Sequence, residues 1–362
     1  MKKVLIIANH RFDRNPGQRF RFEQYFDFLK ENGYECHLSY IITAQDDKIL
    51  YAKGKLPQKA LLAAKAAAKR FRDVFNRNQY DIIFIFREAF FTGSTLFENL
   101  FTKSTAKTIF DFDDAIWHFD VSEANKKLGF LKNPGKTAEI ISKVDMVFAG
   151  NQYLADYAHH HNDNVVIVPT TIDTDEYSPG PFRDGPPICI GWSGSITTIR
   201  HFETSLPVLR RLKKEFGDQV NFKVVGDGSY VNQELGIQGI AWTKQDELKE
   251  LRSMDIGIMP LPDDEWSKGK CGLKGLQYMA LNIATVMSPV GVNSEIIRDG
   301  ENGMLAATED EWVEKLSQLI RDSQLRKRLG EAGRQTVLDG FSVHAQKNNY
   351  LRFFNLLTQD KK

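Results

Sequence analysis

The chain has 362 residues, of which 42% are hydrophobic and 26% are charged, and its formal net charge is +1. This composition is typical of a globular protein and excludes a collagen-like, disordered or membrane-embedded chain. The balanced charge excludes nucleic-acid binding through a global positive field, so we expect no nucleic-acid partner. The length predicts two domains of similar size.

The three cysteines, Cys36, Cys189 and Cys271, lie far apart and form no CxxC pair. Their spacing argues against a disulfide framework or a zinc site and favours a reducing compartment. No apolar run reaches the roughly 18 residues of a transmembrane helix, and the N-terminal run is too short for a signal peptide. We expect a cytoplasmic protein, with peripheral binding to the inner face of the cell membrane as an open alternative.

Short apolar runs alternate with amphipathic segments in the first half of the chain. This pattern predicts βα units around a parallel sheet. A helix is predicted from Gln18 to Asn32, since Gly33 follows at a position that favours glycine. The predicted strands are Val4–Ala8, Cys36–Ile42, Asp81–Phe86, Thr108–Phe112, Met146–Ala149 and Val165–Val168.

Residues 48–77 carry nine bases and one acid, Asp73. Five apolar positions in this segment recur at helical spacing: Leu61, Ala64, Ala68, Phe71 and Phe75. A basic amphipathic helix of this kind can lie on an anionic membrane surface. It can equally pack on the sheet as a crossover helix and leave its lysines in water, so both interpretations stay open.

Asp111-Phe112-Asp113-Asp114 follows a predicted strand and contains an Asp-x-Asp sequence. Paired carboxylates can hold Mg²⁺ or Mn²⁺ against a diphosphate. Aspartates at strand ends also cap loops, and this structural interpretation is the more common one. Arg87 and Glu88 follow another strand and are candidates to line a cleft.

Five of the twelve prolines fall between residues 169 and 187, which favours a linker at 171–187. The βα pattern then restarts and predicts a second Rossmann-like domain over 188–340, after a first one over 1–170. Its predicted strands are Ile188–Trp192, Phe222–Val225, Ile256–Met259 and Ala284–Met287. Three helical patterns follow between residues 309 and 359.

Ligands of α/β domains bind beyond the carboxyl ends of the strands, so the loops there are the candidates for a binding site. Ser193, Gly194 and Ser195 end one strand, and Gly226 and Asp227 end the next. Their backbone N–H groups and hydroxyls suit a phosphate. Tight turns with a helix cap explain the same residues.

A lysine-rich segment runs from Trp266 to Ala280, and a helix is predicted to begin near Gly272. Lys268, Lys270 and Lys274 surround that helix start, where cations disfavour the helix but suit a bound anion. Lys274 and Gln277 are three residues apart and are predicted to share one face. A solvated lysine cluster is the alternative. Further on, Asn293 or Ser294 caps the next helix.

Several motifs together resemble the retaining glycosyltransferases of family 4, which have the GT-B fold. In the second half they are Lys270-Cys271-Gly272-x-Lys274, Leu276 to Ala280, Ser288 to Ile296 and Asp299-Gly300-Glu301-Asn302-Gly303. In the first half they are Pro16 to Arg19, Phe110 to Trp117, Ala149-Gly150-Asn151-x-Tyr153-Leu154 and Val168 to Asp173. The resemblance implies two Rossmann-like domains facing across a cleft, with a C-terminal helix, 341–362, packed on the N-terminal domain.

The family resemblance also implies an activity. A sugar would pass, with retention, from a UDP-, GDP- or ADP-sugar to a hydroxyl of a cell-surface glycan or glycolipid, by a hexosyl- or N-acetylhexosaminyl-type transferase. No metal or other cofactor is implied. The candidate catalytic residues are Lys270, Asp113 and Asp114. The candidate donor-binding residues are Gly17, Arg19, Ser193, Gly194, Ser195, Gly226, Asp227, Lys270, Gly272, Lys274, Gln277, Asn293 and Ser294.

One departure from the family pattern keeps other functions open. The two glutamates usual in the family fall on Gly269 and Gln277. A catalytically silent GT-B protein that binds a nucleotide-sugar, or acts as an assembly partner, is therefore an alternative. A nicotinamide-dependent dehydrogenase is disfavoured, because no Gly-x-Gly-x-x-Gly follows the first strand. A metal-dependent transferase built on Asp111 and Asp113 is the third alternative.

Overall fold

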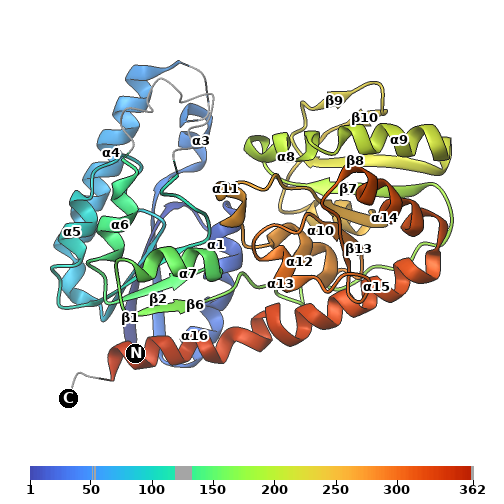
Figure 1. Cartoon of the computed structure of the whole chain (residues 1–362). Coiled ribbons are helices and arrows are strands. Elements are labelled where there is room, and N and C mark those ends of the chain that lie inside the picture. The colour runs from blue at the N-terminus through green and yellow to red at the C-terminus, as the bar shows by residue number, and fades with distance from the viewer. Residues whose placement is uncertain (51, 53, 119–132, 360–362) are drawn as a thin grey trace. The chain divides into compact units, whose positions relative to one another are not determined.

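The computed structural model describes residues 1–50, 52, 54–118 and 133–359 (Figure 1). The chain divides into two compact units. Unit 1 is Met1–Thr170 with Lys347–Lys362, and unit 2 is Thr171–Gln346. Each unit is built on a six-stranded sheet whose strands are parallel, which confirms the predicted α/β class. Among the described residues, no helix is both long and apolar enough to cross a bilayer.

The sheet of unit 1 has the strand order β2-β1-β3-β4-β5-β6. Its strands are β1 (Lys2–His10), β2 (Tyr34–Ile42), β3 (Ile82–Phe86), β4 (Lys107–Phe112), β5 (Met146–Ala149) and β6 (Val165–Ile167). Every residue of β3 is buried, as expected for a parallel strand covered on both faces. The carboxyl ends of β1, β3 and β4 meet at one edge, because these strands are neighbours.

The helices of unit 1 before its last segment are α1 (Pro16–Arg21), α2 (Phe26–Glu31), α3 (Ala44–Leu50), α4 (Leu56–Phe75), α5 (Leu96–Phe101), α6 (Gly135–Ile141) and α7 (Gln152–His159), with 3₁₀ turns η1 (Glu23–Tyr25) and η2 (Arg77–Gln79). The single helix predicted from Gln18 to Asn32 is wrong. The helix is interrupted at Phe22, which has the non-helical angles φ −143° and ψ −31°. Gln18 through Glu23 are all buried, so this segment has no solvent face around which one regular helix forms.

The last helix, α16 (Val343–Thr358), completes the core of unit 1. The ring of Tyr350 stacks on Tyr25 with centroids 4.4 Å apart, and Phe354 meets Tyr34 edge-on at 5.5 Å. The crossing of the C-terminal helix back to the first domain, implied by the family resemblance, is confirmed. The helix lies far from Tyr25 and Tyr34 in sequence. These two rings are therefore covered only when the C-terminal helix packs on unit 1.

Unit 2 has the strand order β11-β8-β7-β12-β13-β14, and a separate two-stranded ribbon of β9 and β10. Its strands are β7 (Ile188–Ser193), β8 (Val220–Gly226), β9 (Val231–Asn232), β10 (Ile237–Gln238), β11 (Ile240–Ala241), β12 (Ile256–Met259), β13 (Ala284–Met287) and β14 (Met304–Leu305). The four longest were predicted. The other four have two residues each, too few for a periodic signal.

The helices of unit 2 pack an apolar core around Trp192, Leu209 and Leu316. They are α8 (Ile199–Glu203), α9 (Leu206–Phe216), α10 (Glu247–Arg252), α11 (Glu265–Lys268), α12 (Leu273–Ala280), α13 (Asn293–Ile296), α14 (Glu309–Arg321) and α15 (Ser323–Thr336), with 3₁₀ turns η4 (Ile196–Thr198) and η5 (Gly217–Gln219) and a π turn η6 (Val337–Phe341). Residues 171–187 form no regular element, yet Ile172 and Tyr177 of this segment are fully buried.

Candidate functional site

In unit 2, the loops that follow β7 and β8 touch through their backbones. The N–H of Gly194 donates to the carbonyl oxygen of Val225 at 2.9 Å. Gly226 has φ +138°, and a Cβ placed on it would lie 1.7 Å from the carbonyl oxygen of Gly194. Only glycine fits this approach, so the two glycine loops of the sequence form one piece of structure at the carboxyl edge of the sheet.

Lys274 extends from the first turn of α12 to this edge. Its Nζ lies 5.6 Å from the centre of the Trp192 ring, and a Cβ on Gly194 would lie 2.9 Å from its Cε. The helix begins after Gly272, whose φ of +71° favours glycine. Tyr278 of the same helix accepts the N–H of Ser193 at 2.7 Å, which fixes α12 to the end of β7.

The predicted site residues of the next loops lie around the same helix start. The Nζ of Lys270 lies 4.8 Å from the centre of the Trp266 ring. A Cβ on Gly272 would meet Ile296 at 2.4 Å and the Oδ1 of Asn293 at 3.8 Å. Asn293 is fully buried, and its Nδ2 donates to the carbonyl oxygen of Ser288 at 3.0 Å. Ser294, beside it, is exposed.

His201 reports the electrostatic character of this edge. Its side chain is 97% buried, and its Nδ1 has no hydrogen-bond partner in the described part of the chain. Burial, together with the charges of Lys274, Lys270 and Arg200, lowers the pKa of His201 to about 4. Lys270, Lys274 and Arg200 therefore act together on the buried, neutral His201 ring, and we call these three side chains the cationic cluster. Sequence analysis missed His201, because nothing in its local pattern sets it apart.

Gln277 has partners other than the cationic cluster. It is buried, and its Nε2 donates at 3.2 Å both to the hydroxyl of Tyr177 and to Oε1 of Glu247. The Tyr177 hydroxyl donates to Oε2 of Glu247 at 2.9 Å. Lys274 and Gln277 lie three residues apart on α12, and Gln277 is held there by Tyr177 and Glu247.

Two of the predicted phosphate-binding residues have local structural roles. Oδ1 of Asp227 accepts both the N–H of Ser229 at 2.9 Å and its hydroxyl at 2.6 Å, which closes a turn. Ser195 and Thr198 form a reciprocal capping box at the start of η4. These contacts correspond to the turn-and-cap interpretation of the loops. Their backbone still lies at the carboxyl edge, next to Gly194.

In unit 1, Asp113 and Asp114 are held by one arginine. The Arg87 guanidinium donates from Nε to Asp113 and from Nη2 to Asp114, both at 2.6 Å. Arg87 has φ +59°, and its N–H donates to the carbonyl oxygen of Asp111 at 2.8 Å, so strand β4 fixes the turn that presents it. A Cβ on Gly17 would lie 2.9 Å from Oδ2 of Asp113, which brings this predicted residue to the same place.

The Asp-x-Asp sequence does not present its two carboxylates to one point. Asp111 is buried and pairs with Arg21, and its pKa is raised by burial against the opposing effect of that arginine. Asp113 pairs with Arg87. Across the described residues, no group of three or more His, Cys, Asp or Glu side chains is arranged to hold a metal ion.

Arg19 is buried and belongs to a network of polar side chains that follows β1. Its Nε is 3.5 Å from Oδ1 of Asp13, whose N–H donates to Oε2 of Glu23 at 2.9 Å. Burial raises the pKa of Glu23 to about 7, and Gln18 donates to its other oxygen at 3.0 Å. Arg19 of α1 and Glu23 of η1 thus both contact Asp13 of the loop that follows β1 and help to fix its shape.

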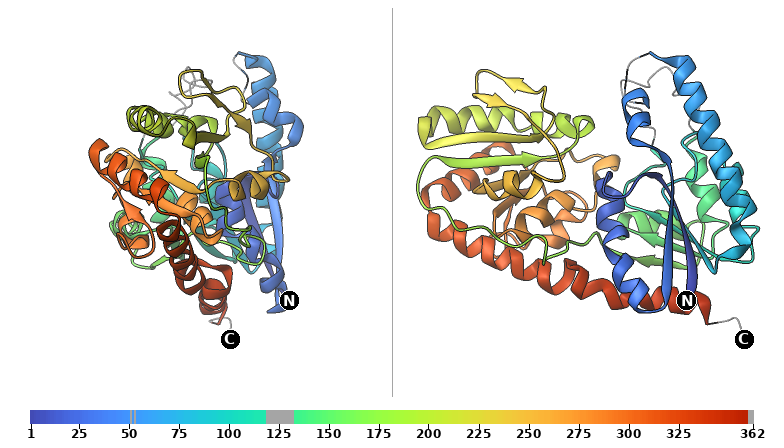
Figure 2. Two further views of the ribbon diagram at one scale, coloured as in Figure 1. Left: turned by 90° about the vertical axis from the view of Figure 1, so that its right-hand side faces the viewer. Right: turned by 180° about the vertical axis from the view of Figure 1, so that it is seen from behind.

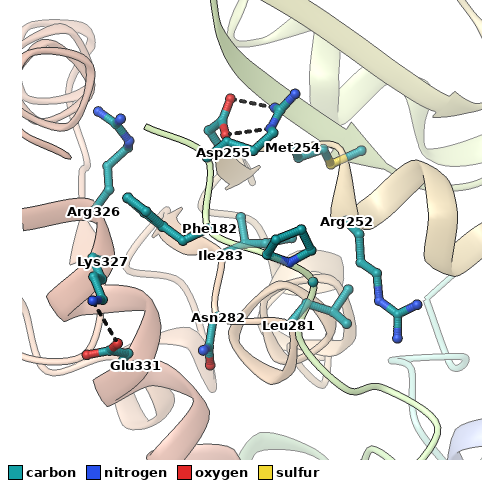
Figure 3. A pocket seen from close by; sticks show the side chains of 13 residues that line it. Phe182, Arg252, Met254, Asp255, Leu281, Asn282, Ile283, Arg326, Lys327 and Glu331 are labelled. Atoms are coloured by element: carbon teal, nitrogen blue, oxygen red, sulfur yellow. Dashed lines mark hydrogen bonds and ion pairs between the residues drawn. The ribbon is translucent and has the colours of Figure 1, made fainter. Parts of the chain in front are cut away.

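A separate pocket lies at the amino-terminal edge of the unit 2 sheet, where β12 and β13 begin (Figure 3). Its charged groups have partners: Arg183 donates to Asp255 at 2.7 Å, and Arg252 to the carbonyl oxygen of Ser178 at 2.7 Å. In Figure 3 the Arg252 guanidinium points away from the centre of the pocket, while Phe182 and Ile283 line it. None of the predicted site residues lines this pocket.

The domain that carries the cationic cluster is similar to known proteins. Residues 188–322 match the family described as glycosyl transferases group 1. N-acetyl-alpha-D-glucosaminyl L-malate synthase of Bacillus anthracis is 28% identical over 121 residues, which cover 33% of this chain and 31% of that protein. The chain spans about a third of the length of this curated relative.

Solved structures share the fold over nearly the whole chain. Sucrose-phosphate synthase of Thermosynechococcus elongatus has a TM-score of 0.70 at 12% identity and matches 99% of this chain and 100% of that one. Anabaena HepE in complex with UDP-glucose has a TM-score of 0.62 at 11% identity, over 98% of this chain and 100% of that one. The chain therefore has the GT-B fold, as the sequence motifs predicted.

Proposed function

We propose that the protein transfers a sugar, with retention, from a nucleotide-diphosphate donor to a hydroxyl of a glycan or glycolipid. The observation that carries this proposal is the cationic cluster, which lies at the carboxyl edge of the sheet in a group 1 glycosyltransferase domain. Two lysines and an arginine near this edge of the sheet attract an anionic ligand.

The diphosphate gains negative charge as the glycosidic bond breaks. Lys270 and Lys274 would stabilise that charge, with help from the backbone N–H groups of the β7 loop. The lysines take the place that a divalent cation has in metal-dependent transferases, so we propose that transfer proceeds without a metal. The ion pairs of Asp113 and Asp114 with Arg87 would hold the unit 1 loops in shape for an acceptor.

The names of similar proteins favour particular donors. The Bacillus relative is named for N-acetylglucosaminyl transfer, and Anabaena HepE is described in complex with UDP-glucose. We propose a UDP-linked hexose or N-acetylhexosamine as donor. Gln277 keeps hydrogen-bonding capacity where the family has a glutamate, and Glu247 beside it supplies a carboxylate to the same buried network.

Calorimetry of the full chain with UDP, GDP and ADP, with and without EDTA, tests the proposal. We expect one diphosphate to bind, with no effect of EDTA. Lys270→Ala is expected to weaken that binding at least about tenfold, since a charge-assisted hydrogen bond contributes about 1.5–3 kcal/mol. The matched control is Lys249→Ala, which removes an exposed lysine of α10 and is expected to bind as the wild type does.

A catalytically silent protein is the second candidate function, and the absent family glutamates favour it. Donor hydrolysis or transfer, measured with the nucleotide that binds, separates the two. Binding without any turnover of the sugar nucleotide would support the catalytically silent protein over the transferase. Equal affinity of Lys270→Ala and wild type would remove Lys270 from the site.

A further inference from the structure

The helix α4 turns an apolar stripe away from the core of its unit. The five positions that recur in the sequence, Leu61, Ala64, Ala68, Phe71 and Phe75, are all exposed. Leu61 is 59% exposed and Phe75 is 82% exposed, which is unusual for side chains of this size. In Figures 1 and 2, α4 is the long blue-to-cyan helix that runs beside α5.

The opposite side of the helix is fixed to the sheet. Leu62, Ala66, Arg70 and Val74 are buried there. The Arg70 guanidinium donates to the carbonyl oxygens of Ala8 at 2.6 Å and Ala89 at 2.7 Å. These buried bonds prevent a rotation of α4 about its axis that would bury the stripe. The apolar stripe is therefore a permanent outer face of this helix.

The charges beside the stripe have one sign. Lys65, Lys69 and Arg72 are exposed on the same helix. Asp73, the only acid of α4, turns inward, where its carboxylate accepts from Arg70 at 3.0 Å and from Ser39 at 2.6 Å. None of the three exposed bases forms an ion pair with another described residue. Apolar side chains flanked by unpaired bases suit a partner with an anionic outer layer and an apolar interior.

We propose that α4 binds the surface of an anionic lipid bilayer and lies in the interface plane. Its 20 residues form a cylinder about 30 Å long, with Leu61 and Phe75 inserted and the bases near the lipid phosphates. Charge complementarity favours lipid over a second copy of the chain, because two such faces would repel each other. This inference does not depend on the proposed sugar transfer.

Co-sedimentation with vesicles tests the proposal, using the full chain and equal parts of phosphatidylglycerol and phosphatidylcholine. We expect binding that falls as salt rises and little binding to phosphatidylcholine alone. The double variant Lys65→Glu/Lys69→Glu is expected to bind at least about 25-fold more weakly, about fivefold for each lysine. Its control, Lys214→Glu/Lys249→Glu, changes two exposed lysines on helices of unit 2 and is expected to bind normally.

The apolar half of the proposal needs a second variant. Leu61→Ser/Phe75→Ser is expected to weaken vesicle binding at least about tenfold. Phe71 is left intact because its ring packs on Phe97 with centroids 5.0 Å apart. The control is Val231→Ser, an exposed apolar position of β9. Because all changed side chains are exposed, circular dichroism and melting temperature should match the wild type.

Three results would overturn the proposal: equal binding to anionic and neutral vesicles, binding unchanged in both α4 variants, or a dimer in light scattering that Leu61→Ser/Phe75→Ser converts to a monomer. The last result would mean that a second copy of the chain, and not lipid, covers the apolar stripe of α4. Lys270→Ala is expected to bind vesicles normally, so a failure of the proposed transfer activity is distinguishable from a failure of this inference.

Discussion

At the scale of single residues, the neutral state of His201 is the most informative sign of the cationic cluster. A pKa of about 4, below the ordinary 6.5, means that folding favours the uncharged ring. His201 therefore contributes stability that is fully present above pH 6.5 and is lost as the pH falls through 4. Burial is the main cause of the low pKa, and two of the cations that lower it further, Lys274 and Lys270, are those that we propose to hold the diphosphate.

A bound diphosphate should therefore raise the pKa of His201, because it offsets the charges of Lys270 and Lys274. The titration is followed by NMR of the ring C–H protons, assigned with His201→Gln. We expect a rise above 4 with the nucleoside diphosphate and no change with the nucleoside alone. The same linkage predicts that diphosphate affinity strengthens as the pH is lowered from the raised pKa of the complex toward 4. An unchanged pKa in the saturated complex would place the diphosphate elsewhere.

At the scale of elements, the edge of unit 2 depends on the contact between the β7 and β8 loops. Gly226→Ala would place a methyl group 1.7 Å from the carbonyl oxygen of Gly194, so the two groups clash. If the loops stay in place, we expect the unfolding free energy to fall by several kcal/mol. If they separate to relieve the clash, we expect most of the diphosphate affinity to be lost. Urea denaturation and calorimetry measure the two effects.

Gly236→Ala is the matched control for that prediction. Gly236 also has a positive φ, +66°, but nothing lies within 4 Å of the added methyl group. The expected cost is about 1–2 kcal/mol from the backbone alone, with normal diphosphate binding. Equal effects of the two substitutions would mean that the close approach of the loops has no energetic importance.

At the scale of the whole molecule, the end of the chain is part of the core of unit 1. Tyr350→Ala removes a ring that stacks on Tyr25 and meets Phe148 at 5.5 Å. We expect unit 1 to lose about 3–5 kcal/mol of stability. Hydrogen exchange by mass spectrometry should show faster exchange in peptides of residues 1–170, and less change in 171–346. Leu356→Ala, at an exposed position of the same helix, should leave exchange unchanged.

Sequence patterns were enough to predict the βα order, the longer strands, the GT-B fold and the glycine and lysine segments of the candidate site. These depend on local patterns: apolar runs, turn residues and spacing along one segment. Tertiary structure decided which side of each pattern faces the core. It turned the stripe of α4 outward, interrupted the predicted helix at Phe22, paired Gln277 with Tyr177 and Glu247, and brought His201 within electrostatic reach of the lysines. Each outcome depends on partners distant in sequence, whose burial and charge no local pattern contains.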